Sequence, residues 1–171
     1  MVTRPVALVA AITFCNTFAI GAFPVLLPDI GSEAGFDDVV LGMLAGAFGL
    51  ARLIADIPAG LLIAHHLRRA MLLGALCLTL GNLLLVSGGP LPVLLAGRAL
   101  YGAGHALAML SGLLTVARFA GQGAHGFSLN VYEFSGMTGM LLGMPNLSDC
   151  WKFVICCNYL VPLACEIECS S

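Results

Sequence analysis

The feature that most constrains this chain is an apolar stretch near its N-terminus, residues 5–28, which contains no charged side chain. A helix needs about 20 mostly apolar residues to cross the hydrocarbon core of a bilayer. A cleavable signal has a shorter apolar core, and four more apolar stretches follow this one. The stretch therefore predicts a membrane helix that is not a signal sequence.

The composition of the whole chain supports a membrane protein. Of its 171 residues, 60% are hydrophobic and 9% are charged, with a mean hydropathy of +1.01, whereas about 25% of the residues in a soluble domain are charged. No soluble fold of this length can bury so much apolar surface. The seven Lys and Arg are scattered along the chain, so there is no nucleic-acid-binding patch. We expect an all-α integral membrane protein with the lipid bilayer as its surroundings.

The apolar stretches predict a helical bundle of five transmembrane helices. They are separated by short segments. The five predicted spans are residues 5–28, 39–64, 70–86, 91–117 and 127–144.

The charges of the connecting segments predict the orientation of the bundle. Lys and Arg concentrate on the cytoplasmic side of membrane proteins. Segment 29–38 has four acidic residues and no basic one, and segment 87–90 has no charge. The basic residues of the other segments all fall on the opposite side, so the N-terminus is predicted to be cytoplasmic. These residues are Arg4, Arg68, Arg69 and Arg118.

Polar side chains inside the predicted spans are candidates for a solute cavity or for coupling to an ion. Such groups are costly in lipid and usually have a function or a partner, and transporters bind their substrates near the bilayer midplane. Proton exchange is one hypothesis for the ionisable members, and a structural hydrogen bond is the alternative. The candidates are Asn16, Arg98, His105 and Glu133.

The second span carries two charges of opposite sign, Arg52 and Asp56. Residues four apart share a helix face and can pair. The pair is interpreted either as a gating or coupling element or as two charges that neutralise each other within the membrane.

Glycines at helical spacing predict close contacts between helices, because small residues let backbones approach. The alternative is that glycine is simply common in membrane helices. The glycines assigned to packing are Gly42, Gly46, Gly102 and Gly104.

Two segments carry recognisable motifs. Residues 60–69 read Gly-Leu-Leu-Ile-Ala-His-His-Leu-Arg-Arg, and residues 98–104 read Arg-Ala-Leu-Tyr-Gly-Ala-Gly. They resemble the patterns Gly-x-x-x-Asp-Arg-x-Gly-Arg-Arg and Arg-x-x-x-Gly-x-Gly of the major facilitator superfamily of transporters. Ala64 stands where the family has an acid that helps to latch its two halves, and this departure implies gating that is either weakened or achieved differently.

The resemblance covers about residues 5–144 and implies the N-terminal half of a transporter for a small solute, with no enzymatic activity and no cofactor or metal. The family has twelve spans in two halves, so a second half-transporter is the expected partner, with protons as a further candidate for symport or antiport. The implied location is a bacterial-type inner membrane, as a multi-pass protein. The gating role falls on Arg52, Asp56, Gly60, Arg68 and Arg69.

The sequence leaves two other functions open. One is a membrane protein without transport activity, such as a remnant or an assembly partner of a missing half. The other is a haem protein or membrane enzyme using His65, His66, His105 or Glu133. Haem ligands must face each other at matched depths, and these histidines are predicted at different depths, which argues against the second.

The composition changes after residue 144, which divides the chain into a membrane region, 1–144, and an atypical tail, 145–171. The tail is expected to be either a frame-shifted segment or a poor sixth span. It has no Cys-x-x-Cys pair, so a zinc or redox site is not expected. Its cysteines are Cys150, Cys156, Cys157, Cys165 and Cys169.

Overall fold

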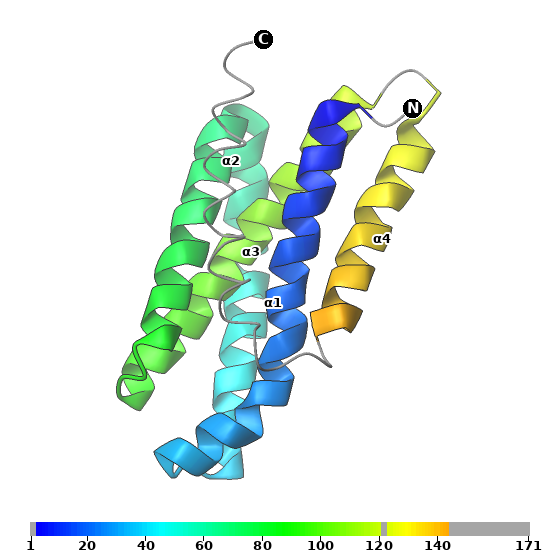
Figure 1. The fold of residues 1–171 in the computed structure, drawn as a ribbon. Helices are drawn as coiled ribbons and strands as arrows, with labels where there is room; N and C mark the ends of the chain where they lie inside the picture. Colours follow the sequence, from blue (N-terminus) through cyan, green and yellow to red (C-terminus); the bar gives the residue numbers. More distant parts are fainter. Residues whose placement is uncertain (1–2, 121–122, 144–171) are drawn as a thin grey trace. The chain divides into compact units, whose positions relative to one another are not determined.

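The computed structural model describes residues 3–120 and 123–143, and the predicted tail lies outside these ranges. The described residues form helices joined by short connections, without a strand, which confirms the all-helical fold (Figure 1). The helices are α1 (Arg4–Ala34), α2 (Asp38–Val86), α3 (Leu91–Phe119) and α4 (His125–Gly143).

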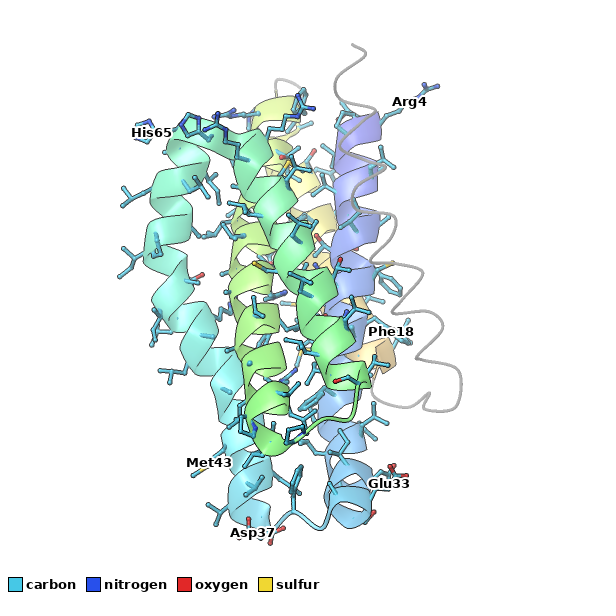
Figure 2. The ribbon with its side chains drawn as sticks, turned by 90° about the vertical axis from the view of Figure 1, so that its left-hand side faces the viewer. Arg4, Phe18, Glu33, Asp37, Met43 and His65 are labelled. Atoms are coloured by element: carbon cyan, nitrogen blue, oxygen red, sulfur yellow. The ribbon has the colours of Figure 1, made fainter. Side chains whose placement is uncertain are left out.

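Helix α2 contains a sharp kink. A straight helix of its 49 residues would be about 74 Å long, more than twice the thickness of a hydrocarbon core. The backbone leaves the helical conformation at His66, with φ −143° and ψ 61°. We call residues 38–65 the first arm and residues 67–86 the second arm; Figure 2 shows Asp37 and His65 at opposite ends of the first.

The count of five membrane helices is not supported. The described residues form four helices, because two predicted spans meet at a single kinked residue inside α2 instead of at a separate loop. Of these four, α1, α2 and α3 are long and apolar enough to cross a membrane. Helix α4 has only 19 residues and is not among them.

The chain divides into two compact units. The hairpin unit comprises residues 26–108, and the α4 unit comprises, among the described residues, 3–25, 109–120 and 123–143. Each unit therefore has its own helix contacts.

In the hairpin unit, the first arm runs parallel to α3. The Nε of Arg98 donates a hydrogen bond to the Leu44 carbonyl at 3.3 Å. One turn further along both helices, Gly102 lies against the backbone of Phe48. Because the contacts advance in the same direction along both helices, the helices run the same way.

The second arm runs antiparallel to α3. Gly81 packs against Gly97 and Tyr101, while Gly74, which comes earlier on the arm, packs against Gly104. The contacts therefore advance on one helix as they retreat on the other. The two arms of α2 thus point in opposite directions, as Figure 2 shows.

In the α4 unit, α1 and α4 run parallel and pack through glycines. Gly139 lies against the backbone of Phe14, and Gly143 lies against that of Phe18. The Ser135 hydroxyl donates to the Ala10 carbonyl at 2.5 Å. A serine hydroxyl that bonds a carbonyl of the facing helix satisfies its polar group without water.

The end of α3 completes the α4 unit. The buried side chains of Val6, Val9, Val116 and Tyr132 form its apolar cluster. The Tyr132 hydroxyl donates to the Met109 carbonyl at 3.0 Å. The one large polar group of this cluster is therefore hydrogen-bonded, as a buried hydroxyl requires.

The contact at Gly104 gives a stability prediction. A Cβ there would lie 2.8 Å from the Leu78 nitrogen and 2.9 Å from the Gly74 oxygen, which are backbone atoms that cannot move alone. Gly104→Ala should lower the free energy of unfolding by about 1–3 kcal/mol, measured by circular dichroism during denaturation in detergent micelles. The control Gly46→Ala meets nothing within 4 Å and should leave stability unchanged or raise it, since alanine favours helix. Equal losses in both variants would contradict this packing.

Candidate functional site

The polar side chains of the hairpin unit gather where the first arm of α2 faces α3. On α3, Arg98, Tyr101 and His105 lie on successive turns and are all buried. Phe48 of the first arm contacts all three. We call these four residues the aromatic–cation cluster.

Arg98 is held by the first arm of α2. Its side chain is 5% exposed. Its Nε donates to the Leu44 carbonyl, and its Cζ lies 4.9 Å from the centre of the Phe48 ring. A buried guanidinium gains from a charge-assisted hydrogen bond and from an aromatic face. Arg98 therefore joins two helices, whatever further role it has toward a solute.

Phe48 is a residue that sequence analysis missed, and Tyr101 is another. Its ring centre lies 6.0 Å from that of Tyr101 and 5.6 Å from that of His105. Distances of 4.5–7 Å are typical of interacting aromatic rings. Neither Phe48 nor Tyr101 carries a sequence signal beyond an ordinary apolar helix position. Their role depends on the register of α2 against α3, which no local pattern reveals.

His105 has an unused hydrogen-bonding atom. Its side chain is 3% exposed, and its Nδ1 has no hydrogen-bond partner among the described residues. A buried nitrogen without a partner costs free energy, and an imidazole nitrogen can either donate or accept. His105 is therefore the member of the cluster with capacity to bind a solute, a water molecule or a proton.

The structure does not pair Arg52 with Asp56. Arg52 is exposed and Asp56 is half-buried. Within residues 3–120 and 123–143, neither side chain has a recorded ion pair or hydrogen bond. Leu44 contacts Arg98, and Phe48 contacts Gly102, so the contacts advance by four residues on both helices. By the same step, Arg52 lies at the level of Ala106, next to His105 at the end of the cluster. The predicted neutralising pair is thus absent from this part of the chain.

The predicted gating residues near the kink of α2 are exposed. Gly60 meets no atom within 4 Å of a Cβ position, and Arg68 and Arg69 are exposed just after the kink.

The four glycines assigned to packing fall into two groups. Gly102 and Gly104 lie at contacts between α3 and the two arms. A Cβ at Gly42 or Gly46 would meet nothing within 4 Å, so their predicted packing role has no counterpart in the described residues. The physical reason is that α3 contacts the arm on the face of Leu44 and Phe48, and these two glycines lie on another face.

The four candidates for a solute cavity fall into both units. Arg98 and His105 lie one above the other on α3 in the hairpin unit. Asn16, which is 6% exposed, and Glu133, which is exposed, belong to the α4 unit. In the described part of the chain, no group of three or more His, Cys, Asp or Glu side chains is placed to hold a metal ion.

The contact of Arg98 with Phe48 can be measured by a double-mutant cycle. Phe48→Leu and Arg98→Met should each destabilise the chain, and the double variant should show a coupling energy of about 1 kcal/mol. The measurement is the free energy of unfolding in micelles. Arg69→Met is the matched control, because exposed Arg69 makes no recorded contact, and it should be additive with Phe48→Leu. Additive losses for both pairs would show that the ring and the guanidinium do not interact.

The family model described as Major Facilitator Superfamily matches residues 9–147. A comparison with curated proteins found no match.

Proposed function

Because this chain belongs to the major facilitator superfamily, a family of transporters, we propose that it forms the N-terminal half of a secondary transporter for a small solute. The match covers most of the chain, and three of the described helices are long and apolar enough to cross a membrane. The observation that carries the proposal is a glycine-rich face with one acid, on the first arm of α2, that no described residue covers at its glycines.

That face combines small residues with a charge. Gly42, Gly46, Gly49, Asp56 and Gly60 follow one another at intervals of three, four or seven residues, so they lie on one side of the helix. A Cβ at any of these four glycines meets nothing within 4 Å in the described residues. We call this side the open face.

Lipid is a poor cover for the open face. A charged side chain at the centre of a membrane helix costs about 2.5–3.5 kcal/mol, and Asp56 and the neighbouring Arg52 have no recorded partner among the described residues. Glycines, by contrast, allow a second helix to approach closely. A helix of the second half of the transporter therefore suits the open face, and rocking of one half against the other would make and break this contact. Arg52, Asp56 and Gly60 then gate, together with Arg68 and Arg69.

The proposed solute-binding residues are Arg98 and His105 in the hairpin unit, and Asn16 and Glu133 are separate candidates in the α4 unit. The unpartnered Nδ1 of His105 supports a role in binding or in proton transfer. Arg98 is already held by Leu44 and Phe48, so it would act mainly by fixing α3 against the first arm.

We further propose that the chain crosses a bacterial-type inner membrane five times, with a cytoplasmic N-terminus. The opposite directions of the two arms are consistent with two crossings within α2. The orientation can be checked with the variant His65→Cys. A membrane-impermeant thiol reagent should label this cysteine from the cytoplasmic side only.

Transport predicts solute accumulation that depends on His105. Membrane vesicles containing the chain should take up at least one solute that vesicles lacking it do not, as detected by mass spectrometry. His105→Phe keeps a buried ring but removes both nitrogens, so uptake should fall about tenfold through loss of one buried hydrogen bond. Leu80→Phe, at an exposed position of the second arm, should have no effect. If no solute depends on the chain, the alternative of a membrane protein without transport activity is favoured.

The open face gives a separate prediction about the partner. A photo-cross-linking amino acid placed at Gly46 in living cells should attach to a membrane protein, identified by mass spectrometry. The same group at Leu80, which is 51% exposed, should attach only to lipid. Lipid adducts alone at Gly46 would show that no second half covers this face.

A further inference from the structure

The turn between the two arms of α2 concentrates positive charge. His65, His66, Arg68 and Arg69 are all exposed around the kink. Across residues 3–120 and 123–143, no hydrogen bond or ion pair is recorded for any of these side chains. We call these four residues the basic end.

Acidic side chains of the same unit lie far from the basic end. Figure 2 shows Glu33 and Asp37 at one end of the hairpin unit and His65 at the other. The first arm between them has 28 residues, residues 38–65, and is therefore about 40 Å long. This exceeds the Debye length of about 8 Å at physiological ionic strength. The charge of the basic end is thus not neutralised by these acids.

No acid lies next to the basic end in the sequence either. Ala64 occupies the position where the related pattern has an acid, and the nearest acid before it on α2 is Asp56. Asp56 is nine residues from His65, about 14 Å along a helix. Arg68 and Arg69 consequently lack a local counter-ion on their own helix.

Exposed leucines lie directly below the basic end. Leu61 lies four residues before His65, on the first arm. On the second arm, Leu72 lies four residues after Arg68. Each of these leucines is therefore one helical turn from a basic residue. Leu73 lies four residues after Arg69 in the same way, and further exposed leucines follow it along the second arm. Leu73, Leu76, Leu80 and Leu83 are 44%, 57%, 51% and 57% exposed.

These leucines form a continuous stripe below Arg69. Steps of four, three, four and three residues keep the stripe on one helix face. From Arg69 to Leu83 the stripe is about 21 Å long, which exceeds half of a hydrocarbon core of about 30 Å. A single acyl chain could lie along its length.

We propose that the basic end and the stripe together bind an anionic phospholipid, with the headgroup phosphate at Arg68 and Arg69 and an acyl chain along the second arm. Positive charge alone would also attract free phosphate, and exposed leucines alone would accept any lipid. Their combination on one arm favours a molecule with an anionic head and an apolar chain. This site is distinct from the open face, which lies on the first arm. It shares Arg68 and Arg69 with the proposed gate, so its test measures lipid binding and not transport.

The test measures lipid binding to the full chain by native mass spectrometry after delipidation in detergent. The probes are phosphatidylglycerol and phosphatidylcholine with identical acyl chains. Phosphatidylglycerol should bind more tightly, and each arginine removed in Arg68→Gln and Arg69→Gln should reduce this preference about fivefold, since a basic residue near an anionic surface contributes about 1 kcal/mol. Equal binding of the two lipids would overturn the proposal.

Matched variants separate the site from general charge. Arg118→Gln removes the same charge from an exposed arginine on α3 and should leave the preference unchanged; an equal loss would overturn the proposal. Arg68→Lys with Arg69→Lys keeps the charge and should retain the preference even if the glutamine variants fold poorly. Inorganic phosphate should not compete at concentrations comparable to the lipid. Competition by phosphate would show a simple anion site that does not recognise lipid.

Discussion

The arrangement of this molecule depends on the cost of leaving a polar group without a partner inside an apolar bundle. A bilayer offers no water to a buried guanidinium or hydroxyl, so a partner within the protein lowers the free energy of such a group. Arg98 has such partners in the Leu44 carbonyl and the Phe48 ring, and Tyr132 has one in the Met109 carbonyl. Each of these interactions joins two helical segments, so solvation of the polar group also fixes helix contacts.

Glycine determines how closely the helices approach. Where α3 meets the second arm, Gly74, Gly81, Gly97 and Gly104 bring backbone atoms together. In the α4 unit, Gly139 and Gly143 do the same for α1 and α4. Without a hydrophobic driving force between helices in lipid, such close packing is a main source of association. The open face of the first arm is also rich in glycine, but its glycines contact no other described residue. We therefore assign this face to a partner.

Charged residues at different positions along α2 have different surroundings in a bilayer. Basic residues are at the kink, acids are at the start, and Arg52 and Asp56 lie between them. Terminal charges can reach headgroups and water, whereas midspan charges must be covered by protein. One helical hairpin can thereby combine a lipid-binding end with a surface for a second half.

Membrane helices, their approximate limits and the family motifs were predictable from residue order, because hydropathy and motif spacing are local properties. The cluster on α3 was predictable only in part: Arg98 and His105 stand out as polar residues in an apolar span, but Phe48 does not. The kink at His66, the lack of pairing between Arg52 and Asp56, and the different surroundings of Gly42 and Gly104 depended on packing. Which face of a helix meets its neighbour is a property of two segments together, so it was decided when the helices packed.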